Sequence, residues 1–132
     1  MIRSLLILCA AAMLSAADHG HGHGEGKPVG TVAVGATQVA VSLDGAIAAG
    51  AHLHVDLALT PATPAPKAVR VWVGIDSGRG STKARAQAED TAGAYAAHVD
   101  VPSPLPEGAQ LWISIEPAEG AAVQAALASA AK

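Results

Sequence analysis

Residues 52–60 read HLHVDLALT, an alternation of aliphatic residues with polar or small ones. Successive side chains of a β-strand point to opposite faces, so this stretch predicts a strand with one buried aliphatic face. The same period of two recurs in six further segments, which are separated by glycine, proline and other turn residues. They cover residues 32–34, 37–43, 69–75, 82–88, 95–101 and 111–115. Seven short, regularly spaced strands predict an all-β fold, an immunoglobulin-like antiparallel β-sandwich of about seven to eight strands.

The C-terminal segment, residues 121–132, allows two interpretations. Its alanines, together with Val123 and Leu127 four positions apart, favour a short helix. The alternation of Val123, Ala125 and Leu127 fits an eighth strand at the edge of a sheet equally well. We favour a short strand that frays.

Residues 1–17 have the three parts of a secretory signal peptide: Arg3, an apolar run over residues 5–14, and small residues up to Ala17. The apolar run is too short to span a bilayer. We therefore expect cleavage after Ala17 and a periplasmic or extracellular protein without a membrane span. The sole cysteine, Cys9, leaves with the leader, so the exported chain can form no disulfide.

Cleavage would leave 115 of the 132 residues, enough for one domain. We assign residues 18–28 to a flexible His/Gly-rich tail and residues 29–132 to the sandwich. Loss of Arg3 lowers the eight basic residues to seven, against eleven acidic ones, a net charge of −4 that argues against nucleic-acid binding. The chain has no Gly-x-Ser-x-Gly elbow, no His-Glu-x-x-His motif and no cysteine outside the leader, so we expect neither an enzyme nor an organic cofactor.

Residues 19–24, the His–Gly segment, read HGHGHG directly behind the leader. Imidazole is the commonest protein ligand of transition metals, and glycine between imidazoles lets the backbone fold several rings around one ion. The segment predicts a disordered tail in which His19, His21 and His23 bind copper(II), nickel or zinc. A spacer that only improves solubility is the alternative.

Strand alternation places the other three histidines on outward faces. His52, His54 and Asp56 share one face of their strand, and neighbouring side chains on that face lie about 7 Å apart. His98 faces outward on the strand at residues 95–101. We predict His52, His54 and His98 as a second, lower-ranked metal cluster, the alternative being ordinary surface histidines. We expect His98 to lie apart from the other two, which would leave this second site incomplete.

Trp72 and Trp112 lie on the polar sides of their predicted strands. Ala94 and Ala96 would lie between the two indoles and form a flat apolar strip beside His98. We predict that Trp72 and Trp112 bind a partner, either an envelope protein or a second copy of the chain. The alternative is a cross-strand pair, or a register slip that buries one ring.

Three short stretches carry a family resemblance: GAY at 93–95, HVDVP at 98–102 and LPEGAQLWI at 105–113. Residues 90–116 thus resemble the closing strands of the YtkA-like and FixH-like exported immunoglobulin-type domains. The resemblance implies a role in copper handling or oxidase assembly. The only methionines, Met1 and Met13, lie in the leader, so the methionine-rich copper(I) sites of related domains have no counterpart here. Imidazole ligands suit copper(II), nickel or zinc better.

Two functions therefore remain open. The first is an exported β-sandwich that binds a divalent transition metal through the His–Gly segment, in metal buffering or supply. The second is a structural or protein-interaction module of the cell envelope, with the segment as a spacer.

Overall fold

The computed structural model describes residues 26–128, which form nine β-strands and no helix. No helix in this range is long and apolar enough to cross a membrane. The expected signal peptide and the predicted ligands His19, His21 and His23 lie outside the described residues. The strands are β1 (Lys27–Val34), β2 (Thr37–Asp44), β3 (His52–Thr60), β4 (Ala68–Gly74), β5 (Ala84–Arg85), β6 (Gln87–Ala88), β7 (Ala94–Asp100), β8 (Gln110–Glu116) and β9 (Val123–Leu127).

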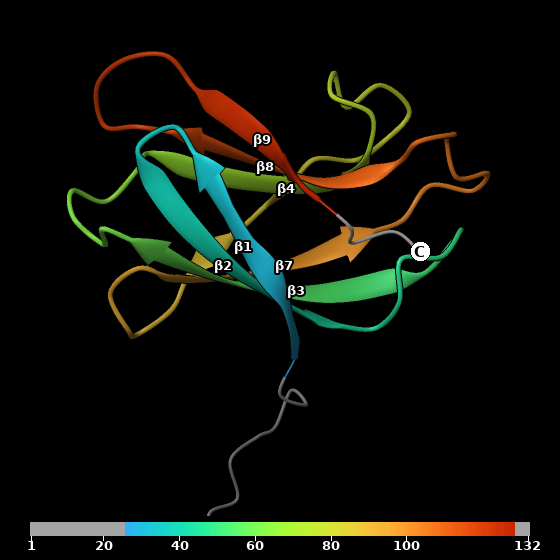
Figure 1. Ribbon diagram of the computed structural model, residues 1–132, viewed down its shortest axis with the longest axis horizontal. Helices are drawn as coiled ribbons and strands as arrows, with labels where there is room; N and C mark the ends of the chain where they lie inside the picture. Colours follow the sequence, from blue (N-terminus) through green and yellow to red (C-terminus); the bar gives the residue numbers. More distant parts are fainter. Residues whose placement is uncertain (1–25, 129–132) are drawn as a thin grey trace, which may run out of the picture.

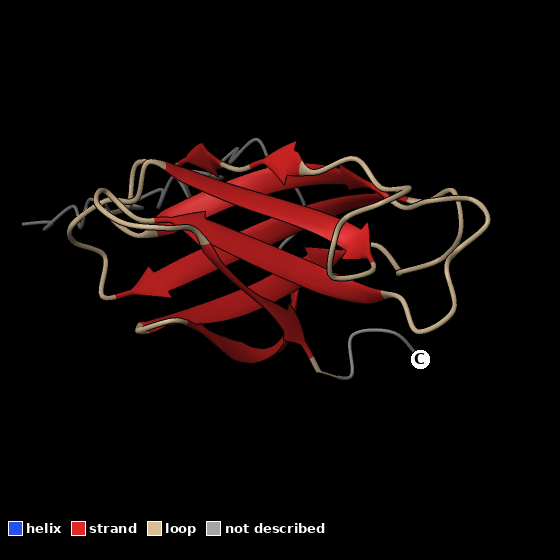
Figure 2. Cartoon of the chain, turned by 90° about the horizontal axis from the view of Figure 1, so that it is seen from above, coloured by secondary structure: helices blue, strands red, loops and turns tan. Residues whose placement is uncertain are grey.

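The strands form two antiparallel sheets stacked face to face (Figures 1 and 2). The five-stranded sheet has the order β1-β2-β3-β7-β6, and the four-stranded sheet has the order β5-β4-β8-β9. The predicted antiparallel β-sandwich is confirmed. The two sheets put segments that are far apart in sequence side by side, with β3 next to β7 and β4 next to β8.

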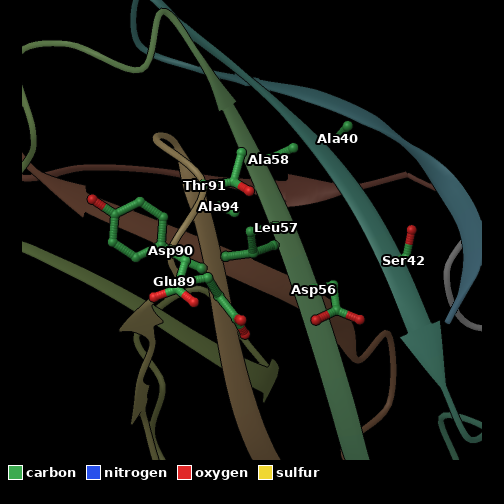
Figure 3. A pocket seen from close by; sticks show the side chains of 10 residues that line it. Ala40, Ser42, Asp56, Leu57, Ala58, Glu89, Asp90, Thr91 and Ala94 are labelled. Atoms are coloured by element: carbon green, nitrogen blue, oxygen red, sulfur yellow. The ribbon is translucent and has the colours of Figure 1, made fainter. Parts of the chain in front are cut away.

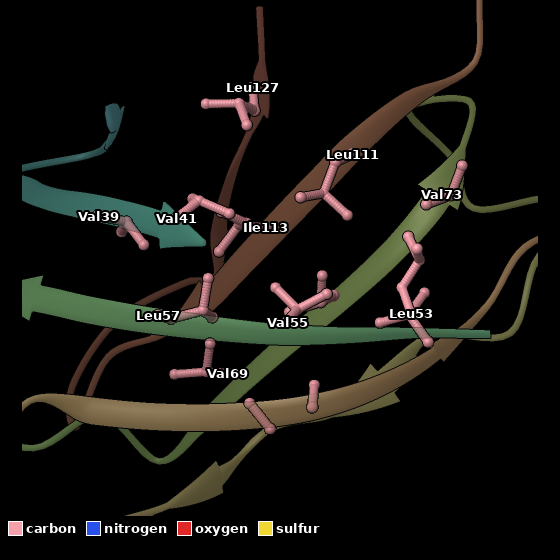
Figure 4. Close-up of a cluster of buried hydrophobic side chains, with 14 of the residues drawn as sticks. Val39, Val41, Leu53, Val55, Leu57, Val69, Val73, Leu111, Ile113 and Leu127 are labelled. Atoms are coloured by element: carbon pink, nitrogen blue, oxygen red, sulfur yellow. The ribbon is translucent and has the colours of Figure 1, made fainter. Parts of the chain in front are cut away.

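The core lies between the sheets and contains the aliphatic rows that the alternation predicts (Figure 4). Every second residue of β3, from Leu53 to Leu59, is buried, and β4 and β8 contribute matching rows. The chain has no phenylalanine, so valine, leucine and isoleucine fill this space. Full burial of one such side chain stabilises the fold by about 1.5–3 kcal/mol, so the sandwich depends on many modest contributions.

The strand expected at residues 82–88 is divided between the two sheets. β5 pairs with β4, whereas β6 pairs with β7 in the other sheet. Ala86, between them, is buried, and its backbone N–H donates to the carbonyl of Val69 at 2.8 Å. The chain therefore crosses from one sheet to the other along one edge of the sandwich.

Strand β1 begins at Lys27, two residues before the expected start of the domain at residue 29. Lys27 and Pro28 pair with Leu43 and Ser42 of β2, so both belong to the sheet. The register shifts between Pro28 and Gly30, which marks a β-bulge at Val29. A bulge inserts one extra residue and so reverses which alternate positions face outward.

The C-terminal segment contains a strand, β9, and no helix among its described residues. Val123, Ala125 and Leu127 pair with the aliphatic row of β8, and Leu127 is buried in the core. The strand lies at the edge of its sheet, and Val123 is 41% exposed. A Cβ on Gly30 would lie 3.3 Å from Leu127 Cδ1, so β9 also packs against β1 of the opposite sheet.

Candidate metal-binding face

The outer surface of the five-stranded sheet carries an array of imidazoles and carboxylates, called here the histidine face. Its members come from three adjacent strands, β2, β3 and β7. They are Asp44, His52, His54, Asp56, His98 and Asp100. The array arises because alternate residues of all three strands point away from the core and the antiparallel register aligns them.

The centre of the histidine face is a pair of imidazoles from neighbouring strands. His54 of β3 is directly opposite His98 of β7. Their ring centroids are 4.9 Å apart, and the ring planes are inclined by 59°. The expectation that His98 lies apart from His54 was therefore wrong. β3 and β7 are neighbours in one sheet, and their register brings the two imidazoles together.

Two carboxylates lie beside His54. His54 Nε2 is 3.0 Å from Asp56 Oδ1, and the His54 side chain is 14% exposed. An ionised carboxylate only accepts hydrogen bonds, so Nε2 of His54 donates in this bond. Asp44 lies opposite His54 on the other side, in β2.

His52 occupies a different environment on the same face. It is opposite Asp100 of β7, and its Nδ1 is hydrogen-bonded to Asp100 Oδ1. The side chains of His52 and Asp100 are 85% and 68% exposed. His52 is thus held toward Asp100 at the exposed end of the strands, whereas His54 and His98 face each other.

A hollow of about 510 Å³ lies on the same side of the five-stranded sheet (Figure 3). Its floor consists of small residues of β2, β3 and β7, including Ala40, Ala58 and Ala94. Asp56 borders it on one side, and Glu89 and Asp90, which precede β7, border it on the other. Its negative charges favour cations.

The described residues do not by themselves form a metal site. Within residues 26–128, no group of three or more His, Cys, Asp or Glu side chains has an arrangement that could hold a metal ion. His54 and His98 alone supply two imidazoles. Protein sites for zinc use three or four ligands from the chain. The histidine face therefore needs ligands from elsewhere to make a metal site.

The predicted tryptophan strip differs from the structure. Trp72 and Trp112 are direct cross-strand neighbours on the outer side of the four-stranded sheet, with stacked rings whose centroids are 6.2 Å apart. Trp72 is fully buried, because the connection between β4 and β5 folds over it. The prediction of an exposed strip with Ala94 and Ala96 was wrong, since those alanines lie in the other sheet. The cross-strand alternative is confirmed.

Sequence reasoning missed three carboxylates on this side of the sheet. Asp44 has the outward parity of the second predicted strand, so the alternation alone could have placed it on a surface. Its position beside His54 depends on the β2–β3 register. Glu89 and Asp90 lie in a turn, and no periodic signal links them to Asp56.

Comparison of the chain with models of known protein families, with curated proteins and with solved structures found no match.

Proposed function

We propose that this protein is an exported metal-binding module that holds a divalent transition metal for buffering or supply, and that its role is binding rather than catalysis. The observation that carries the proposal is the His–Gly segment, with His19, His21 and His23 at alternate positions only a few residues before β1. Two further imidazoles and several carboxylates lie on the outer face of the sheet that contains β1, the strand that follows this segment in the sequence. Negative charge around such a surface raises the local concentration of cations.

The ligand chemistry favours copper(II), nickel or zinc. Downstream of residue 17 the chain has no cysteine and no methionine, so imidazole and carboxylate must supply the ligands. Imidazole binds a metal only when it is neutral, so we expect binding to decline as the pH falls. The resemblance of residues 90–116 to exported copper-handling domains supports the same class of ligand.

The rival function, an interaction module that uses Trp72 and Trp112, has less support. Trp72 is fully buried and its indole N–H donates to the carbonyl of Ile75 at 2.9 Å. Trp112 is half-buried and donates to the carbonyl of Gly74 at 3.1 Å. Both indoles stack on each other and donate hydrogen bonds within the chain, so neither is a large exposed anchor for a partner.

Calorimetric titration of the untagged protein with zinc tests the proposal. The key variant replaces His19, His21 and His23 with asparagine, which keeps the length and polarity of the segment. A matched control replaces the exposed His52 with asparagine. We expect the triple variant to lose high-affinity binding and the control to retain it. Equal affinity and stoichiometry in the triple variant and the unaltered protein would refute metal binding by the His–Gly segment.

A further inference from the structure

The basic residues of the described chain gather on one side of the sandwich. Residues 26–128 contain six lysines and arginines, and five of them lie on β4, on β5, between these strands or directly before β4. Four of the five form what is called here the basic face, on the outer side of the four-stranded sheet, and Lys67 flanks it. The basic face consists of Arg70, Arg79, Lys83 and Arg85.

Like charges are directly opposite each other at the centre of the basic face. Arg70 of β4 is the cross-strand partner of Arg85 of β5, an arrangement that destabilises a sheet. Within residues 26–128, the one ion pair of the basic face joins Arg70 Nη1 to Glu116 Oε2 at 3.4 Å. Arg85 Nη2 donates to the carbonyl of Lys67 at 3.1 Å, and a carbonyl does not neutralise its charge. The described chain therefore leaves most of this positive charge without a matching carboxylate.

The opposite side of the sandwich carries the complementary charge. Strands β2, β3, β6 and β7 contain no lysine and no arginine. The carboxylates of the histidine face, together with two from the turn before β7, form what is called here the acidic face. They are Asp44, Asp56, Glu89, Asp90 and Asp100.

The hollow of about 510 Å³ gives the acidic face a place for side chains from a partner (Figure 3). Its floor consists mainly of small residues, and no lysine or arginine lines it. Asp56 borders it on one side and Glu89 and Asp90 on the other. A long basic side chain would lay its alkyl part over the alanines and bring its charged end to these carboxylates. The hollow thus fits lysine and arginine side chains.

A single chain cannot bring its own two faces together. They are the outer surfaces of different sheets, and the core lies between them (Figure 2). A second copy can place its basic face on the acidic face of the first. Each copy would then still present one unused face of each charge.

We propose that copies of this chain associate head to tail, with the basic face of one copy docked on the acidic face of the next. The exposed side chains of Arg79 and Arg85 lie against the carboxylates of Glu89 and Asp90 at the hollow. Exposed ion pairs are individually weak, so the contact depends on several pairs together and on low salt. Because the two contacting surfaces differ, association continues beyond a dimer. This inference is independent of the proposed metal binding.

Sedimentation velocity of the full chain, with a chelator present to exclude metal bridges, tests the proposal. Lowering the salt concentration from 1 M to 0.01 M extends the range of electrostatic attraction from about 3 Å to about 30 Å. At low salt we expect a sedimentation coefficient that keeps rising with protein concentration, and at 1 M salt that of a monomer. Arg79→Glu/Arg85→Glu and Glu89→Lys/Asp90→Lys should each weaken association at least about tenfold. A coefficient that does not rise at low salt, or that stops at the value of a dimer, would overturn the proposal.

A mixture of the two charge-reversed variants distinguishes docking of these faces from a change in net charge. In the mixture, each intact face meets an intact partner and each reversed face meets a reversed one, so association should return. Glu107→Lys/Glu119→Lys is the matched control, because it changes the net charge as Glu89→Lys/Asp90→Lys does but in the β7–β8 and β8–β9 connections. We expect this control to associate like the unaltered protein, and circular dichroism verifies that all variants are folded. Failure of the mixture to associate, or an equal loss in the control, would overturn the proposal. Retention of the unaltered protein on heparin without self-association would also overturn it and would assign the basic face to a polyanion.

Discussion

Both outer surfaces of the sandwich carry large or chemically reactive side chains that strand alternation turns outward. The two surfaces differ in whether another part of the chain covers these side chains. On the four-stranded sheet, alternation turns Trp72 and Trp112 outward, and the connection between β4 and β5 covers them. On the five-stranded sheet, alternation turns His54 and His98 outward, beside exposed residues such as His52 and Asp44. The chain itself covers the tryptophan pair on one surface, whereas imidazoles and carboxylates lie on the other. Alternation therefore fixes the side on which a residue lies, and distant segments determine what covers it.

The cover of the tryptophan pair is held by specific bonds. The indole of Trp72 donates to Ile75, and the ammonium group of Lys83 lies 4.4 Å from the centroid of a Trp72 ring. Ser81 Oγ donates to the carbonyl of Val73 at 2.6 Å. Gln124 of β9 donates to the carbonyl of Asp76 at 2.7 Å. The connection thus forms part of the stable fold.

Removal of the covered ring should have the largest effect on stability. We expect Trp72→Ala to lower the free energy of unfolding by about 3–5 kcal/mol, because it empties a fully buried site and leaves the connection without its platform. Urea unfolding followed by circular dichroism measures the change. Trp112→Ala is the control, with a smaller loss expected at this half-buried position. A loss below about 1 kcal/mol for Trp72→Ala would show that the ring contributes little to the fold.

Alternation in the sequence predicted the sheet face on which each residue lies. It did not predict which strands pair with each other. The outward placement of His54, His98, Trp72 and Trp112 followed from local alternation and is confirmed. The pairing of β3 with β7 did not follow, because it joins segments about forty residues apart and is decided by packing of the whole sandwich. The division of residues 82–88 between two sheets also has no local signal, since small alanines suit either sheet.

A single hydrogen bond of the covering connection should have an intermediate effect. Ser81→Ala removes the bond to the carbonyl of Val73, and we expect a loss of about 1 kcal/mol in the free energy of unfolding. Ser77 lies in the same connection, and its Oγ accepts from the exposed backbone N–H of Arg79 at 3.2 Å. Ser77→Ala is therefore the matched control with a smaller expected loss. Equal losses would mean that Ser81 does not hold the cover in place.

The smallest effect is expected at the exposed end of the histidine face. His52 and Asp100 form a cross-strand pair, but both side chains are largely exposed, and such pairs contribute little because solvent screens them. We expect His52→Ala to change the free energy of unfolding by less than about 0.5 kcal/mol without metal. Zinc affinity should also stay constant, because the ligands of the proposed function are His19, His21 and His23, and His52 is hydrogen-bonded to Asp100. Urea unfolding and zinc titration of the same preparation measure both quantities. A tenfold loss of zinc affinity in His52→Ala would contradict this prediction, because it would make His52 a ligand of the ion.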